Sequence, residues 1–260
     1  MPILTNFVAK ARKMKKGLII GKGWLGQRLE NKLNHKYQFV TTKRNADAEN
    51  CIAIDFDEPT TMNINVDSFD FILILIPFGR RNSEEVLINR FNQISEFIKG
   101  FKKQIFLISS TGIYPDLEME IDENSIPNDE LIKSYSTIER LMQNNFPQLI
   151  ILRLGGLMGD DRYLSKYINE TSPNLNSVVN HIHYQDVIEI IHQLIEKNIT
   201  QETYNITTSL KPNKQQVISH QLNKKINHND TKIGKSISPK KIINELNYQF
   251  IYPNPIYFQD

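Results

Sequence analysis

Three glycines near the start of the chain have the spacing of a phosphate-binding turn. Gly21, Gly23 and Gly26 form the pattern GxGxxG within GLIIGKGWLGQRLENKL, residues 17–33. In such a turn the first glycine permits a tight bend after a strand, the second lets a pyrophosphate approach the backbone, and the third allows close helix–strand packing. The free N–H groups of the following helix point at that pyrophosphate. The pattern predicts a dinucleotide site; the alternative is that the glycines only make a strand-to-helix turn.

The residues after the second expected strand indicate which nicotinamide cofactor would bind. Sites that prefer NAD usually place a carboxylate there for the ribose diol, whereas this chain has Lys43 and Arg44. Arginine binds a 2′-phosphate through paired charge-assisted hydrogen bonds, so NADP is favoured over NAD. Asp55, after the third expected strand, is expected near the adenine edge. The alternative for Lys43 and Arg44 is a solvated pair of loop residues.

Short apolar runs alternate with amphipathic segments along most of the chain. Expected strands span residues 17–20, 37–42, 51–54, 71–76, 105–108, 149–154 and 203–206, and expected helices span 83–99, 130–145 and 187–197. Strands separated by helices imply right-handed crossovers, and continuous apolar strands imply burial on both faces. The sequence predicts an α/β fold of the Rossmann class. This is a doubly wound parallel sheet with helices on both faces and a small C-terminal substrate lobe.

The same alternation predicts how the chain divides into parts. We expect an N-terminal extension at 1–16, an NAD(P)-binding Rossmann domain at 17–155 and a smaller substrate lobe at 156–260. Residues 187–206 are expected to return to the Rossmann sheet. Met14 comes just before the first strand, so the residues ahead of it are either a loosely held extension or an over-long choice of start site.

Composition narrows the classes of function. With 31 basic and 29 acidic residues the formal net charge is +2, which gives no electrostatic footprint for nucleic acid or an anionic membrane. The single cysteine, Cys51, lies in an apolar run, so neither a disulfide framework nor a cysteine metal site is expected. No apolar run approaches the roughly 20 residues that a transmembrane helix needs. We therefore expect a cytoplasmic protein with a small-molecule substrate and without nucleic-acid or membrane partners.

Five segments follow one another in the order GKGWLGQRL, FILILIP, ISSTGIYPD, LRLGGLMGDDR and NHIHYQDVIEII. Together they resemble the extended short-chain dehydrogenase/reductase family, also called the NAD-dependent epimerase/dehydratase family, and the C-terminal tail is similar to that of its shorter, atypical members. The resemblance implies hydride transfer at a carbonyl or carbinol carbon by a monomer or homodimer. It implies that Ser109 and Ser110 lie beside the nicotinamide. It also implies that the dinucleotide is lined by Gly21, Gly23, Trp24, Leu25, Gly26, Arg44, Asp55, Ile76 and Pro77.

The tyrosine–lysine pair that this family uses for proton transfer is missing. The family places a lysine four residues after the tyrosine and an acidic residue four positions further on. If Glu139 is that acid, Leu131 and Tyr135 occupy the tyrosine and lysine positions; if Tyr135 is the tyrosine, Glu139 replaces the lysine. Three interpretations stay open. The protein is a reductase or epimerase whose acid is Tyr114, Tyr135 or a water held by Ser110, or a non-catalytic NADP-binding redox sensor or regulator, or a purely structural protein.

A histidine pair and an arginine have alternative roles. His181 and His183 are two residues apart, a spacing compatible with shared metal ligation, but no third ligand cluster accompanies them, so no metal site is expected. The resemblance places Asn180, His183 and Asp186 at the substrate mouth, while Asp186 is equally expected as a helix N-cap. Arg153 either meets an anionic group of the substrate or anchors its strand in an ion pair.

Overall fold

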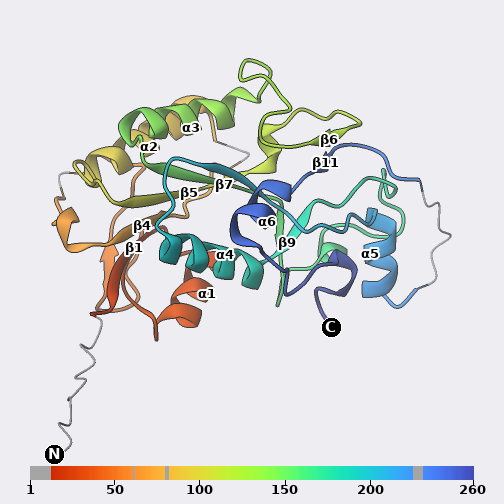
Figure 1. Ribbon diagram of the computed structural model, residues 1–260, viewed down its shortest axis with the longest axis horizontal. Coiled ribbons are helices and arrows are strands. Elements are labelled where there is room, and N and C mark those ends of the chain that lie inside the picture. The colour runs from red at the N-terminus through yellow and green to blue at the C-terminus, as the bar shows by residue number, and fades with distance from the viewer. Residues whose placement is uncertain (1–12, 61, 80–81, 225–230) are drawn as a thin grey trace, which may run out of the picture.

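A seven-stranded parallel sheet forms the centre of the molecule (Figure 1). This computed structural model describes residues 13–60, 62–79, 82–224 and 231–260. The sheet has the order β10-β7-β5-β4-β1-β2-β3. Its strands are β1 (Lys15–Ile20), β2 (Tyr37–Lys43), β3 (Cys51–Ala53), β4 (Phe71–Ile74), β5 (Gln104–Ser110), β7 (Leu149–Leu154) and β10 (Thr203–Ile206). The strand order reverses between β1 and β4, so the predicted doubly wound Rossmann fold is confirmed.

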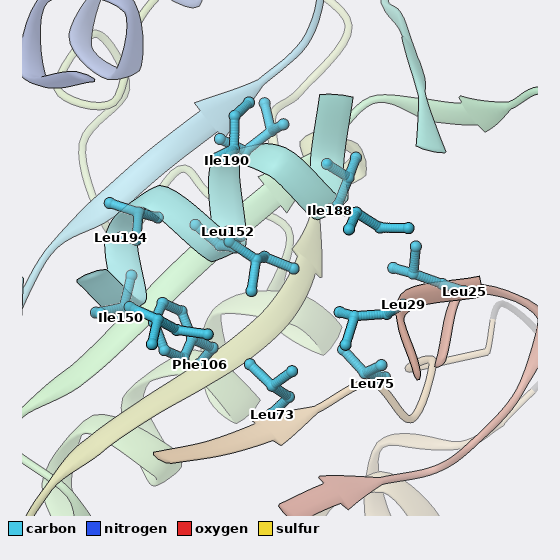
Figure 2. Packing of buried hydrophobic residues seen from close by; sticks show 14 of the residues in the cluster. Leu25, Leu29, Leu73, Leu75, Phe106, Ile150, Leu152, Ile188, Ile190 and Leu194 are labelled. Carbon is cyan, nitrogen blue, oxygen red and sulfur yellow. The ribbon is translucent and has the colours of Figure 1, made fainter. Parts of the chain in front are cut away.

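Helices cover both faces of this sheet. They are α1 (Trp24–Leu33), α2 (Glu84–Phe97), α3 (Lys133–Asn145), α4 (Tyr184–Lys197) and α6 (Lys240–Leu246). A further helix, α5 (Lys214–Gln221), packs in a separate apolar cluster with Leu164 and Val179. Alternate residues of each strand point to opposite faces, so Leu73 packs with α1 and α4 whereas Ile72 packs with α2 and α3. Figure 2 shows Leu29 of α1 and Ile188 of α4 on the same side as Leu73. Full burial of such a side chain contributes about 1.5–3 kcal/mol, which fixes α1 against the strands.

Several boundaries differ by one to three residues from those expected, two of them for reasons that the structure shows. The helix expected at 130–145 begins at Lys133, because the backbone N–H of Ile132 bonds to the carbonyl of Ile113 and residue 132 is extended. The strand expected at 71–76 ends at Ile74, three residues before Pro77, which has no N–H to donate. Both changes leave the order of elements as predicted.

The C-terminal part adds two small sheets and returns one strand to the main sheet. β8 (Gly156–Met158) pairs with β9 (His181–His183), and β6 (Glu120–Ile121) pairs with β11 (Ser236–Ile237). β10 pairs in parallel with β7 at the edge of the main sheet. The division into a Rossmann domain and a substrate lobe stays a prediction.

Asp186 fastens the C-terminal tail and does not cap α4. Its carboxylate accepts hydrogen bonds from the Tyr248 hydroxyl (2.8 Å) and from the backbone N–H groups of Ile251 (2.7 Å) and Tyr252 (3.1 Å). Burial raises its pKa, against the effect of these donors. The N-cap is His183, whose ring accepts from the N–H of Gln185. The predicted cap was therefore wrong by three positions.

The predicted extension at 1–16 overlaps the sheet, because β1 already begins at Lys15; residues 1–12 lie outside the described part of the chain. Within that described part, every helix is too short or too polar to cross a lipid bilayer.

Candidate functional site

A cavity of about 670 Å³ lies at the carboxyl ends of β1, β2 and β4, where the order of the sheet reverses. Ligands of open α/β sheets bind at this position. Its lining combines the glycine loop, the end of β2 and the loops after β3 and β4. The lining residues are Gly21, Lys22, Gly23, Thr42, Lys43, Arg44, Asn45, Ile54, Asp55, Phe56, Leu75, Ile76, Pro77, Gly79, Asn82 and Arg90.

The glycine loop has the conformation that its sequence predicts. Gly21 has a positive φ of 86°, and a Cβ there would lie 2.5 Å from Cγ1 of Ile76. Nothing lies within 4 Å of the position of a Cβ on Gly23, so its backbone is open to a ligand. The loop is tied to β2, because the N–H of Gly21 donates to Oγ1 of Thr42 (3.0 Å) and the N–H of Lys22 donates to the Thr42 carbonyl (2.8 Å). The helix that follows begins at Trp24 and points its free N–H groups to the cavity side.

Two arginines share one carboxylate at the far end of the cavity. Arg44 lies 2.6 Å from Oδ2 of Asp57 and 3.1 Å from Oδ2 of Asp55. Arg90, on α2, makes a bidentate contact with Asp57 at 2.7 and 2.9 Å. Its hydrogen bonds, together with the charge of Arg44, hold the pKa of the Asp57 carboxyl below its ordinary value. The side chain of Arg44 is 65% exposed, so it is accessible to an anion entering from solvent.

The second predicted cation, Lys43, belongs to a separate charged cluster. Asp47 binds both Lys43 (2.8 Å) and Lys22 (3.0 Å), and Glu30 also binds Lys22 (3.0 Å). Hydrogen bonds from the two lysines lower the pKa of Asp47. Lys22 is almost fully buried, and its two carboxylate partners raise its pKa although burial opposes this. The cluster therefore holds the glycine loop next to the end of β2.

Four predicted residues do not line this cavity. Leu25 is buried in the core, and a Cβ on Gly26 would meet the carbonyl of Gly21 at 3.3 Å, which fits a role in helix–strand packing. Trp24 donates from Nε1 to Asp161 (2.7 Å), and its ring is stacked by arginines from α1 and from the segment after β8. Ser109 points into the protein interior. The cofactor role predicted for these four residues stays a prediction.

Ser110 and Tyr135 approach the same point beyond the end of β5. A methyl group on Gly112 would lie 3.2 Å from Oγ of Ser110 and 3.1 Å from the hydroxyl of Tyr135. Ser110 is also the N-cap of a short 3-10 turn, where its Oγ accepts from the N–H of Gly112 (3.0 Å). Tyr135, in the first turn of α3, packs against Phe78. The sheet edge thus carries two hydroxyls that face one small space.

A buried network next to these hydroxyls fixes α3 to the sheet. Ser109 donates to Oε1 of Glu139 (2.6 Å), and the guanidinium of Arg153 binds the same carboxylate at 2.7 and 3.1 Å. Of the two roles predicted for Arg153, the structure shows the ion pair that anchors its strand.

Tyr114 belongs to this network and not to the accessible site. Its hydroxyl donates to Oδ1 of Asn205 (2.8 Å) and accepts from Arg153 (2.8 Å), and its side chain has no exposed surface. Burial raises the pKa of its hydroxyl. The Tyr114 hydroxyl is thus buried and occupied by two partners in this structure, and its role as an acid stays a prediction.

Comparison with known proteins agrees with this geometry. No family model matches the sequence. Protein YeeZ of Escherichia coli is 27% identical over a 271-residue alignment that covers 94% of this chain and 98% of that protein. A structure from Methylobacillus flagellatus assigned as an NAD-dependent epimerase/dehydratase superposes with a TM-score of 0.76 at 20% identity, over 94% of this chain and 96% of that chain. The chain has the fold of the extended short-chain dehydrogenase/reductases.

Two further structures with the extended dehydrogenase/reductase fold contain a nicotinamide nucleotide. A human epimerase family protein solved with NADPH has a TM-score of 0.69 at 13% identity, over 94% of this chain and 97% of that chain. A UDP-glucuronic acid 4-epimerase from Bacillus cereus solved with NAD has a TM-score of 0.71 at 16% identity, over 94% of each chain. The fold that the resemblance of the five sequence segments implied is therefore confirmed.

Leu131 and Tyr135 stand at the two positions where the resemblance leads us to expect a tyrosine and a lysine. Leu131 is buried in a small apolar cluster with Ile113 and Ile121. Within the described ranges, no lysine makes a hydrogen bond to the hydroxyl of Tyr135. No group of three or more metal-binding side chains occurs there either, and His183 is instead packed against Tyr252.

Arg90 is the lining residue that sequence reasoning missed most clearly. The expected helix at 83–99 has an apolar stripe through Leu87 and Phe91, and Arg90 lies on the same face. A charged residue on a buried stripe needs a partner, so this position could have been singled out. Its partner, Asp57, comes from a loop 33 residues away, and periodicity does not show such a contact.

Proposed function

We propose that this protein binds NADP in the glycine-loop cavity and transfers hydride between the nicotinamide and a small carbonyl or carbinol substrate. The observation that carries the proposal is the combination of one cavity with an open glycine loop at one end and an accessible arginine at the other. Backbone N–H groups at the start of α1 suit the pyrophosphate, and Ile76 and Pro77 offer an apolar wall.

The choice of NADP rests on Arg44. Its two carboxylate neighbours leave the guanidinium largely exposed, so a 2′-phosphate can exchange with or join them. Asp55 and Asp57 are also able to accept from a ribose diol, which would suit NAD. The human neighbour contains NADPH and the Bacillus cereus neighbour contains NAD, so the fold accommodates both nucleotides.

Ser110 and Tyr135 are the residues that we assign to the reacting oxygen. NADPH, when bound, supplies the hydride. Ser110 holds the carbonyl oxygen, and the Tyr135 hydroxyl donates the proton that turns this oxygen into an alcohol. The phenolate left on Tyr135 regains a proton from water. A positioned acid contributes about 10² to 10⁴ in rate, so Tyr135 has a measurable role.

The second function is NADP binding without turnover, in a redox sensor or regulator. It is favoured by the apolar Leu131 at one catalytic position and by the lack of a lysine bonded to Tyr135 in the described chain. Without such a lysine the phenol is not activated by a neighbouring cation.

One experiment separates the two functions. NADPH binding is measured by fluorescence, and NADPH oxidation is measured with a panel of small aldehydes and ketones, for the wild type, Ser110→Ala and Tyr135→Phe. The exposed Tyr167, whose mutation to Phe leaves the cavity intact, provides the control. Catalysis predicts normal NADPH binding in all proteins and oxidation reduced at least 100-fold in the two site variants. Binding without oxidation by the wild type favours the sensor, and absence of NADPH binding contradicts both functions.

A further inference from the structure

A lysine at the carboxyl edge of the sheet has no carboxylate partner among the residues that the structure describes. Lys211 follows β10, and its ammonium donates to Oγ1 of Thr207 at 2.6 Å. Thr207 in turn donates to the carbonyl of Ile237 (3.0 Å), so its oxygen is held in place for the lysine. Across residues 13–60, 62–79, 82–224 and 231–260, no acidic side chain lies within ion-pair distance of Lys211.

The charged surroundings of Lys211 include one acidic group, which already has another partner. Lys211 and Lys214, at the start of α5, both act electrostatically on His181 of β9. Glu120 on β6 is the acidic group that faces Lys211, and it is already paired with Lys240 at 2.8 Å. An ammonium removed from water without an anion is costly, so this cluster is incomplete as it stands.

His181 presents a ring that is free to bind a ligand. Its side chain makes no hydrogen bond to any other described residue, and it is partly exposed. The ring lies against the backbone of Gly156, where any side chain would collide with it. Burial and the two neighbouring lysines lower the pKa of His181 to about 4, so the free ring is neutral at pH 7.

The cluster lies next to the site proposed for hydride transfer. Ser110 and Leu154 are paired residues of β5 and β7, and the chain continues from Leu154 directly into β8, which pairs with β9 at His181. A Cβ on Gly155 would also meet Cγ2 of Thr207 at 2.8 Å. The Lys211 cluster therefore borders the space beyond Ser110, away from the adenine end of the cavity.

We propose that Lys211 and His181 bind the anionic group, a phosphate or carboxylate, of the substrate. This inference rests on the proposed function, because it names the substrate class as a small carbonyl compound that carries an anionic group. Lys211 supplies the charge, Thr207 orients its ammonium, and His181 donates from one ring nitrogen. Burial lowers the pKa of Lys211 to about 7, so binding of an anion above this pH is accompanied by proton uptake.

Titration calorimetry with inorganic phosphate and with acetate tests the proposal. All proteins in this experiment carry Arg44→Ala, so that anions are not bound by Arg44. Titrations at pH 8 in two buffers of different ionisation enthalpy give the number of protons that the protein takes up on binding. Lys211→Gln is expected to weaken binding about 10- to 100-fold, the loss of one charge-assisted hydrogen bond. Lys211→Arg keeps the binding and takes up fewer protons, because arginine is already charged. Lys99→Gln, at an exposed surface pair, is the control.

The outcomes decide between the alternatives. Tighter binding of phosphate than acetate indicates a phosphorylated substrate, and the reverse indicates a carboxylic acid. Equal affinity in the Lys211→Gln protein and its parent overturns the proposal, as does failure of the parent to bind either anion. NADPH binding by the protein with intact Arg44 is measured separately, so failure of the anion site is distinguishable from failure of the cofactor site.

Discussion

Replacing Glu139 with glutamine should destabilise the protein strongly. Glu139 and Arg153 are 3% and 7% exposed, and their side chains meet at 2.7 Å between α3 and β7. Glu139 raises the pKa of the Arg153 guanidinium against the effect of burial. Arginine is not deprotonated in proteins, so the cation persists when Glu139 is replaced. Loss of one partner of a buried pair costs about 3–5 kcal/mol of unfolding free energy. For a chain of this size that corresponds to a fall in Tm of roughly 6–20 °C.

Urea unfolding followed by circular dichroism measures this cost. The control is Glu96→Gln, whose partner Lys99 is an exposed neighbour on the surface, and its cost should stay below about 1 kcal/mol. The double variant Glu139→Gln with Arg153→Met should recover part of the loss, since it removes the unpaired cation. A loss below about 1 kcal/mol in Glu139→Gln, or a double variant less stable than the single one, would refute the assigned role of the ion pair.

Two other perturbations test the loop and the unpaired lysine. Gly21→Ala should cost about 1–3 kcal/mol of stability and weaken NADPH binding, because φ is 86° and the new Cβ would collide with Ile76. Thermal unfolding measures the loss of stability, and NADPH fluorescence measures the loss of binding. Gly23→Ala is the control for backbone strain, because a Cβ on Gly23 meets no protein atom. Burial lowers the pKa of Lys211 from the ordinary 10.5 to about 7 in the folded protein, so between these pH values the unfolded state binds one more proton and stability rises with pH. Lys211→Met should remove that rise in urea midpoints between pH 7 and 10, and an unchanged slope would contradict it.

The order of elements and the glycine loop could be predicted from the sequence because both depend on local patterns. The strand FILILI, the stripe through Leu25 and Leu29, and the spacing of the glycines each lie within about 20 residues. These features predicted the doubly wound sheet and the glycine loop between its first strand and first helix.

The roles of several side chains could not be predicted, because they depend on contacts between distant segments. Tyr114 follows β5, as an active-site residue would, yet its hydroxyl donates a hydrogen bond to Asn205, 91 residues later in the chain. Asp186 has the position and type of a cap, but the C-terminal tail, 62 to 66 residues later, supplies its donors. Whether Lys211 has a carboxylate partner depends on which side chains several distant elements bring close to it, and the sequence does not show this.

The central claim is that Arg44 selects NADP at the glycine-loop cavity. The most direct test is the ratio of the dissociation constants for NADH and NADPH, measured by fluorescence for the wild type, Arg44→Ala and the control Lys99→Ala. One charge-assisted contact with a 2′-phosphate corresponds to about 1.5–3 kcal/mol, or roughly 10- to 100-fold. We predict that wild type and control bind NADPH more tightly by such a factor and that Arg44→Ala binds both nucleotides about equally. Equal affinity of the wild type for the two nucleotides, or an unchanged preference in Arg44→Ala, would contradict the account.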